Sequence, residues 1–362
     1  MRYLDLRKCA TGRERGVLHG STFAGEITSL VKLRIYLASK ISGFTPDGLL
    51  AIAETHLPIL KGFDAELYEE LLGLAEGSGC SPAELVVLNQ YTDIRDLAPE
   101  KWGDAGTSTA LPGDADYDGG CTMLWSKTAS GPVFAQTWDM HASAMPYVMM
   151  LRVPDAGGGD AYVLSLTGCL GMAGLNAAGL GIGINNLTSN DAVPGVVWSA
   201  IVRRALRESA TDAARDMLLA CKVGSGHHYL VCDETSVVSV ETSGQRRKVI
   251  FAGETSDFVH SNHCLDEEIA ACNRVPEFST TQDRQDAMRA SLDSNPIVSI
   301  EDAWQRLGSH DGYPRSICTN MASPEAPHAA ATCAGIAMDP KRRRLFAVAG
   351  FTHNVAPEEF SF

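Results

Sequence analysis

The residues best suited to chemistry stand at Gly119-Gly120-Cys121-Thr122, where a glycine-rich segment ends and a β-strand pattern begins. A cysteine thiol can attack the carbonyl of the preceding residue if the backbone bends, and glycine permits such conformations. The attack would give a thioester, and water would then release a chain beginning at Cys121. Its freed α-amine, with an ordinary pKa near ~7.7, could act as a base beside the thiol. Taken alone, the junction fits an ordinary loop cysteine better than a catalytic one.

Two polar residues downstream strengthen the chemical interpretation. Asp139 ends the stretch Ala-Gln-Thr-Trp-Asp, and a hairpin turning at Ser130 would place it directly opposite Cys121. Its carboxylate would then orient the new amine. Asn262 follows another strand pattern, and its amide could donate to a developing oxyanion, a contact worth ~3 kcal/mol of barrier. Turn and capping roles are the alternatives for both residues.

The elements that must position these residues change character along the chain. Residues 1 to about 100 have apolar residues at helical spacing, with one helix expected over 14–39, a second from Thr45-Pro46 to about Leu60, and a third over 64–75. Ser81-Pro82-Ala-Glu84 is a capping box that starts a fourth helix. Residues 101–120 are rich in small and polar residues and indicate a linker.

Beyond the linker, alternating patterns predict many strands joined by hairpins. We expect strands near 121–128, 132–138, 148–153, 161–166, 171–185 (a hairpin), 228–232, 237–241, 248–251, 258–261, 332–338 and 344–349. Two helices are expected at about 195–208 and 211–221. A helical head and antiparallel hairpins indicate an α+β protein in which helices pack against sheets.

Together these segments resemble the self-processing isopenicillin N acyltransferase family (acyl-coenzyme A:6-aminopenicillanate acyltransferase). The resemblance is carried by Gly-Cys-Thr at 120–122, Gln136-Thr-Trp138-Asp139, Gly174-Leu-Asn-Ala-Ala-Gly-Leu at 174–180, and Ser-Asn-His at 261–263. It runs from about Gly120 to the C-terminus, and more loosely over the helical head.

The resemblance implies a four-layer αββα fold, that of the N-terminal-nucleophile hydrolases. It also implies a precursor cut at Gly120–Cys121 into two subunits that stay together, residues 1–120 and the catalytic residues 121–362. Cys121 would be the nucleophile, Asp139 the partner of its amine and Asn262 the oxyanion donor. More distant cysteine-type relatives, bile-salt hydrolases and acid ceramidase, add an arginine, for which Arg315 is the candidate.

Substrate contacts follow from the same motifs, and we expect them from Gln136, Trp138, His141 and His263. Ala135 stands where the family pattern has glycine, and Met-His follows Asp139 where an aromatic residue is commoner. These departures preserve the chemistry but put a penicillin substrate in doubt. The expected substrate is a small amide or an acyl-coenzyme A thioester, attacked through an acyl-cysteine. No metal or redox cofactor is expected.

Composition bounds the remaining classes of function. A net charge of −14 makes nucleic acid an unexpected partner. The charged N-terminus does not look like a signal peptide. The charge-free stretch 163–187 is too glycine-rich for a membrane span, so we expect a cytoplasmic protein, either monomeric or homo-oligomeric. The ten cysteines are expected to be reduced.

Three alternatives stay open from the residues. A zinc site could form from His227, His228, His260, His263 and Cys264, although helical and paired-cysteine spacings are missing. A papain-like protease would need its cysteine at a helix start, not a strand start. A catalytically silent binding protein on the same scaffold is the third.

Overall fold

The computed structural model describes residues 1–98, 101, 120–154, 159–253 and 257–362. Most of the expected linker, 101–120, therefore lies outside the described residues. No single described helix is both long and apolar enough to cross a bilayer. One sharply bent pair of helices, Ala65–Ser78 with Pro82–Asn89, meets that test by length and composition.

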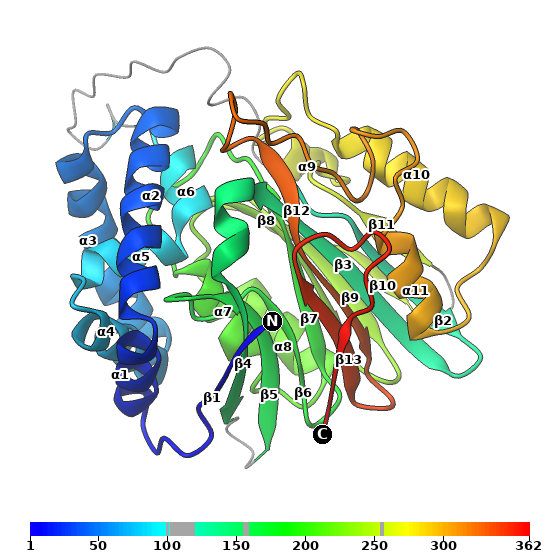
Figure 1. Cartoon of the computed structure of the whole chain (residues 1–362), viewed down its shortest axis with the longest axis horizontal. Helices are drawn as coiled ribbons and strands as arrows, with labels where there is room; N and C mark the ends of the chain where they lie inside the picture. The colour runs from blue at the N-terminus through cyan, green and yellow to red at the C-terminus, as the bar shows by residue number, and fades with distance from the viewer. Residues whose placement is uncertain (99–100, 102–119, 155–158, 254–256) are drawn as a thin grey trace.

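A bundle of helices forms one side of the molecule (Figure 1). The helices are α1 (Gly12–Thr22), α2 (Ala24–Ser42), α3 (Pro46–Phe63), α4 (Ala65–Ser78), α5 (Pro82–Asn89) and α6 (Tyr91–Asp96). The predicted starts of the second and fourth helices are confirmed, with Thr45 and Ser81 as N-caps and a full capping box at Ser81.

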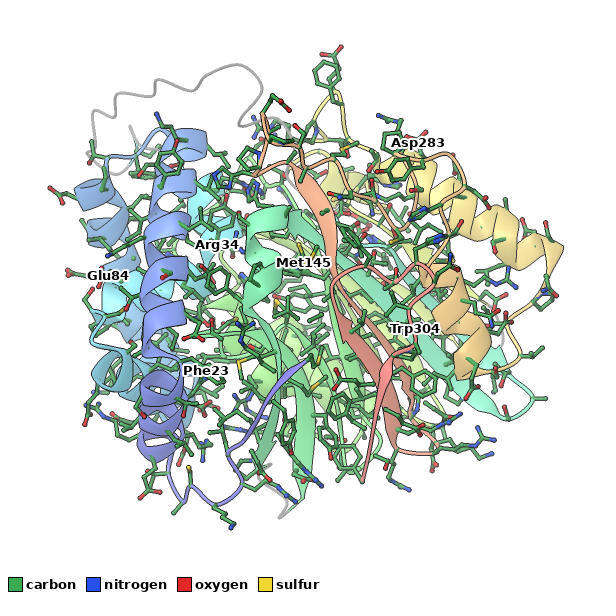
Figure 2. All side chains as sticks on the ribbon, in the orientation of Figure 1. Phe23, Arg34, Glu84, Met145, Asp283 and Trp304 are labelled. Carbon is green, nitrogen blue, oxygen red and sulfur yellow. The ribbon has the colours of Figure 1, made fainter. Side chains whose placement is uncertain are left out.

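The single helix expected over 14–39 is wrong, because the chain breaks at Phe23 between α1 and α2 (Figure 2). The hydroxyls of Ser21 and Thr22 both donate to the carbonyl of Leu18. Such local bonds compete with the backbone pattern of a helix and favour its interruption. The break turns α2 so that it packs mainly against α5 and α6, whereas α1 packs against α4.

The N-terminal segment is not purely helical, which corrects the sequence expectation. Its first element is strand β1 (Arg2–Asp5), which pairs in parallel with β4 (Val148–Pro154). The N-terminal amine forms an ion pair with Glu358. Residues 1–120 therefore contribute a strand to a sheet that is otherwise built from the rest of the chain.

Two sheets form the centre of the molecule. The eight-stranded sheet has the order β1-β4-β5-β6-β7-β8-β9-β10 and the six-stranded sheet the order β11-β2-β3-β12-β13-β14. Their remaining strands are β2 (Met123–Thr128), β3 (Gly131–His141), β5 (Asp160–Leu166), β6 (Ala173–Asn176), β7 (Gly181–Leu187), β8 (Gly226–Cys232), β9 (Val237–Thr242), β10 (Arg247–Gly253), β11 (Phe258–His260), β12 (Ala330–Asp339), β13 (Arg344–Ala349) and β14 (Glu358–Ser361). The predicted hairpins at 171–185 and 332–349 are confirmed as the pairs β6–β7 and β12–β13.

The two sheets face each other and are covered by helices on their outer sides. Gln136 of β3 bridges them, donating to the carbonyl of Ile184 on β7 at 2.7 Å. Helices α7 (Trp198–Ala205) and α8 (Thr211–Ala220) pack on the eight-stranded sheet. Helices α10 (Thr281–Ser294) and α11 (Ile300–Leu307) pack on the six-stranded sheet, and α9 (Glu267–Ala270) and the 3₁₀ helix Ala142–Tyr147 lie in connections. The expected four-layer αββα arrangement is thus confirmed (Figure 1).

The register of the β2–β3 hairpin differs from the expected one by a single residue. Thr128 pairs with Gly131 around a two-residue turn, so Met123 pairs with Gln136. Continuing this register places Asp139 opposite Gly120, and these two residues form a β-bridge. The expectation that Asp139 stands directly opposite Cys121 is wrong, because it assumed a turn centred on Ser130.

Candidate active site

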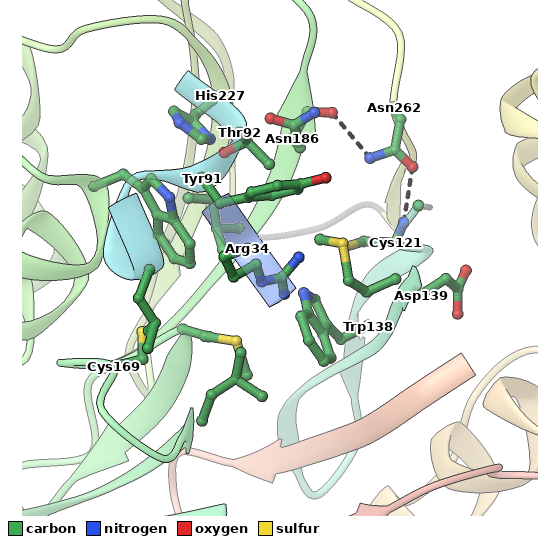
Figure 3. Close-up of a pocket in the computed structure, with 17 residues that line it drawn as sticks. Arg34, Tyr91, Thr92, Cys121, Trp138, Asp139, Cys169, Asn186, His227 and Asn262 are labelled. Atoms are coloured by element: carbon green, nitrogen blue, oxygen red, sulfur yellow. Dashed lines mark hydrogen bonds between the residues drawn. The ribbon is translucent and has the colours of Figure 1, made fainter. Parts of the chain in front are cut away.

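Cys121 is buried immediately before β2 and lines a pocket between the N-terminal helices and the two sheets (Figure 3). Arg34 of α2 and Tyr91 and Thr92 of α6 form one side of this pocket. Trp138 and Asp139 of β3 form another. Both segments that flank the Gly120–Cys121 bond therefore build the same pocket.

The peptide carbonyl before Cys121 is held by the backbone of Asp139. The Asp139 N–H donates to the Gly120 carbonyl oxygen at 2.6 Å, and the Gly120 N–H donates to the Asp139 carbonyl at 2.8 Å. A donor at 2.6 Å polarises the carbonyl and is placed to bind the oxyanion that nucleophilic attack would generate.

The residue at position 120 must be small because a side chain there would collide with Arg284. An added Cβ would lie 2.8 Å from Arg284 Cζ, closer still to Nη2, and 3.0 Å from Asn262 Oδ1. The sequence favoured glycine here for its conformational freedom. The structure gives a different reason: Gly120 has no positive φ, and the Arg284 guanidinium lies too close for a side chain.

Asn262 binds the nitrogen of Cys121, and Arg284 in turn binds Asn262. Asn262 Oδ1 accepts from the Cys121 N–H at 2.8 Å and from Arg284 Nη2 at 2.8 Å, while Asn262 Nδ2 donates to the Asn186 carbonyl at 2.9 Å (Figure 3). Arg284 Nη1 also donates to Thr122 Oγ1 at 3.0 Å. The amide oxygen of Asn262 therefore accepts hydrogen bonds from two N–H groups, one on the Cys121 backbone and one on Arg284.

Asp139 is a buried carboxylate whose ionisation is finely balanced. Burial raises its pKa to about 6, against the opposing effects of the Arg284 guanidinium and of a hydrogen bond from Thr332. Thr332 Oγ1 donates to Oδ1 at 2.7 Å, and Arg284 Nη1 lies 4.0 Å from Oδ2. Oδ2 has no hydrogen-bond partner among the described residues. It is therefore placed to accept a proton.

The thiol of Cys121 is protonated at neutral pH in the continuous chain. Burial and then the nearby Asp139 charge raise its pKa to about 12. The carbonyl of Cys121 accepts from Asn185 Nδ2 at 3.0 Å, and Asn185 Oδ1 is 2.7 Å from His228 Nδ1. A buried thiol with such a pKa needs a base to become a nucleophile.

Four residues expected to contact substrate lie at different depths. Trp138 lines the pocket. Gln136 lies behind it as the bridge between sheets. His141 reaches the pocket through Tyr91, whose hydroxyl is 3.0 Å from His141 Nε2. His263 does not line the pocket; its Nδ1 is 3.0 Å from Thr281 Oγ1.

The structure does not bring Arg315 to this pocket. Its side chain is 47% exposed and pairs with Asp283 at 2.6 Å, near the start of α10. The arginine beside Cys121 is Arg284, which sequence reasoning missed. Arg284 stands in a polar stretch, Thr281-Gln-Asp-Arg, that we did not identify as a helix, and only the burial of α10 against β11 directs it inward.

Thr332, Asn185 and Arg34 are other residues of the site that the sequence did not reveal. Each lies far from Cys121 along the chain and belongs to an element with an ordinary apolar pattern. No short motif marks any of them.

The histidines considered for zinc are held by other partners. His228 and His260 are stacked with ring centres 3.6 Å apart, and His260 Nε2 is 2.8 Å from Glu241. Within the residues that the structure describes, no group of three or more His, Cys, Asp and Glu side chains is arranged to hold a metal ion.

Several known proteins are similar to this chain in sequence or structure. One similar protein is the acyl-coenzyme A:6-aminopenicillanic-acid-acyltransferase 40 kDa form of Emericella nidulans. It is 23% identical over 314 residues, covering 85% of this chain and 82% of that protein. Similar solved structures include a mutant of conjugated bile acid hydrolase from Clostridium perfringens, with a TM-score of 0.46 and 10% identity over 67% of this chain and 92% of that one. A Caenorhabditis elegans ortholog of N-acylethanolamine-hydrolyzing acid amidase has a TM-score of 0.42 and 12% identity, over 61% and 93%.

A family model extends this similarity across most of the chain. The model described as acyl-coenzyme A:6-aminopenicillanic acid acyl-transferase matches residues 126–350. This range includes Asp139, Asn262 and Arg284. The chain belongs to the acyl-coenzyme A:6-aminopenicillanic acid acyl-transferase family and is an acyltransferase or amide hydrolase.

Proposed function

We propose that this protein cuts its own Gly120–Cys121 bond and then uses Cys121 to transfer or hydrolyse the acyl group of a small amide or thioester. The observation that carries the proposal is that hydrogen bonds from pocket residues reach both ends of one buried peptide bond. Its carbonyl oxygen accepts from Asp139 N–H and its nitrogen donates to Asn262 Oδ1. Polarisation of the carbonyl and a fixed nitrogen are what acyl transfer at this bond requires.

Self-cleavage begins when Cys121 Sγ attacks the Gly120 carbonyl carbon. Asp139, with a pKa of about 6 and an unpartnered Oδ2 among the described residues, is the base we assign to the thiol proton. The S–C bond forms and the C–N bond breaks as the nitrogen of Cys121 takes a proton. Water then hydrolyses the thioester, which leaves a carboxylate on Gly120 and a free thiol.

The mature site would use the new α-amine as its own base. Asn262 Oδ1, which holds the Cys121 nitrogen in the continuous chain, would accept from this amine, and Asp139 would orient it. An amine with an ordinary pKa of about 7.7–8.0 is partly neutral near pH 7 and can take the thiol proton.

Acyl transfer then repeats the same chemistry on a substrate. The thiolate attacks the substrate carbonyl, and the oxyanion is stabilised by Asn262 Nδ2 together with backbone N–H groups. The leaving amine takes the proton from the α-amine of Cys121. Water resolves the acyl-cysteine in hydrolysis, and a second amine resolves it in acyl transfer.

The test is direct detection of the acyl-enzyme. Purified protein is mixed with an acyl-coenzyme A thioester or an N-acyl amide, quenched in acid and digested for mass spectrometry. We expect the acyl mass on the peptide that begins at Cys121, and none in Cys121→Ala. Turnover without any adduct, retained in Cys121→Ala, would overturn the proposal.

A further inference from the structure

The pocket contains a buried cation that the proposed chemistry does not use. Arg34 lines the pocket from α2 and is only 3% exposed. Its Nε and Nη1 have no hydrogen-bond partner within the described parts of the chain. Burying a guanidinium without an anion costs free energy, so such an arrangement calls for an explanation.

The other buried arginines show what is missing at Arg34. Arg15 and Arg203 both contact Glu70 at 2.8 Å, and Arg95 contacts Asp96 at 3.1 Å. Arg284 lies 4.0 Å from Asp139. Among the buried arginines that the structure describes, Arg34 is the one without a carboxylate this close.

The surroundings of Arg34 are neutral and aromatic. Its guanidinium lies over the Tyr91 ring at 4.3 Å from the ring centre, on the side of α2 that faces the sheets (Figure 2). Burial lowers the pKa of Arg34, and the groups that oppose this are Tyr91, Cys333 and Cys169, all uncharged at neutral pH. An arginine remains protonated even so, and an anion entering this space would gain from the low local dielectric.

Other polar atoms of the same lining also lack partners. Asn186 Oδ1, Trp198 Nε1 and His227 Nδ1 are buried and have no hydrogen-bond partner among the described residues. Figure 3 shows Arg34, Asn186 and His227 around the space that also reaches Cys121. Trp198 Nε1 donates and Asn186 Oδ1 accepts, so a ligand that carries both a negative charge and an amide N–H would satisfy these atoms together.

We propose that Arg34 binds a carboxylate of the substrate, so that the enzyme selects N-acyl compounds that carry a carboxylate on the acyl group or on the amine. The inference rests on the proposed function, because it names the substrate class of the Cys121 pocket. A guanidinium presents two parallel donors to a carboxylate, which fixes orientation as well as charge. Arg34 is then a specificity-determining residue supplied by the N-terminal segment.

Binding to a variant that cannot turn over tests this apart from catalysis. Because Cys121→Ala does not cleave itself, it is co-expressed as two chains, residues 1–120 and residues 121–362, so that the pocket has its cleaved form. Affinities are then measured calorimetrically for N-pentanoylglycine against N-pentanoylglycinamide, and for N-butylglutaramic acid against its primary amide. The first pair carries the charge on the amine side and the second on the acyl side. We expect the charged member of one pair to bind about tenfold or more tightly, as a charge-assisted hydrogen bond provides.

Matched second substitutions identify the residue responsible. Adding Arg34→Met should reduce the affinity ratio to about one, whereas adding Lys32→Met, an exposed charge on the same helix, should leave it unchanged. Arg34→Met should also leave the thermal midpoint unchanged or raise it, because an unpaired buried charge is removed. Equal binding within both pairs, a ratio that survives Arg34→Met, or a lowered midpoint would overturn the proposal. A failed proposed function would show instead as missing self-cleavage and acylation in the wild type.

Discussion

Asp139 and Gly120 are joined by two backbone hydrogen bonds, and the shorter, at 2.6 Å, runs from the Asp139 N–H to the carbonyl that Cys121 would attack. The same residue that polarises this carbonyl carries the carboxylate whose charge acts on the Cys121 thiol. In the proposed self-cleavage, this one residue on β3 would therefore supply both a donor for the attacked carbonyl and a base.

Gly120→Ala should strongly slow self-cleavage while leaving the chain folded. The new methyl group would lie 2.8 Å from Arg284 Cζ and 3.0 Å from Asn262 Oδ1, so the bridge to Asp139 cannot keep its geometry. We expect cleavage to slow at least about 100-fold, as misplacement by an ångström does in catalysis. The measurement is the fraction of cleaved chain on a denaturing gel over time.

Gly25→Ala is the matched control for that substitution. A Cβ at this position of α2 meets nothing within 4 Å, so cleavage should proceed as in the wild type. Equal cleavage of Gly120→Ala and Gly25→Ala would show that the approach of Arg284 does not constrain position 120.

Self-cleavage should depend on pH through Asp139. Because its pKa is raised to about 6, the carboxyl is protonated and cannot act as a base below that pH. The rate should therefore fall about tenfold for each pH unit below about 6 and level off above it. Chain made by cell-free synthesis and moved into buffers on both sides of this value provides the measurement. A rate that rises as pH falls would contradict the assignment.

Arg284→Met should move that pH profile towards higher pH. The guanidinium stabilises the ionised form of Asp139, so its loss raises the pKa of the carboxyl and leaves less base at a given pH. Each unit of increase slows cleavage about tenfold on the acidic side of the profile. Arg315→Met, which removes a surface partner of Asp283, should leave the profile unmoved. The opposite pattern would favour the arginine that the sequence suggested.

The N-terminal piece should stay bound after cleavage. β1 pairs with β4, and Glu70 of α4 holds both Arg15 of α1 and Arg203 of α7. Glu70→Ala leaves two buried guanidinium groups without this carboxylate and should cost about 3–5 kcal/mol of unfolding free energy. Chemical denaturation measures that loss. Gel filtration of cleaved wild type should give one peak containing both pieces, and separation without denaturant would contradict the expected association.

The sequence predicted the fold class and most strands because its hairpins carry local signals, such as Asn176 to Gly179 and Asp339-Pro340. The capping residues Thr45 and Ser81 likewise predicted where α3 and α5 begin. The predicted pairing partner of Asp139 was off by one residue. Turn length decides the register of a hairpin, and the turn consists of two residues, Ala129-Ser130, and is not centred on Ser130.

Long-range packing explains what the sequence could not predict at the site. Arg284 and Arg34 lie on helices whose polar residues have no distinctive spacing, and they reach the Cys121 pocket only after both outer layers pack on the sheets. Cys121 and Asn262 could be proposed from the sequence because a glycine-rich junction and a strand end are local features. Asn262 Oδ1 does contact the Cys121 nitrogen, and the oxyanion role assigned to its amide stays a prediction.

Self-cleavage at Gly120–Cys121 is tested most directly by intact mass measurement of the wild type beside Cys121→Ala. We expect the wild type to give two pieces, residues 1–120 and residues 121–362, and Cys121→Ala to give one chain of 362 residues. A wild type that remains a single chain after long incubation and is nevertheless active would contradict the proposed self-cleavage.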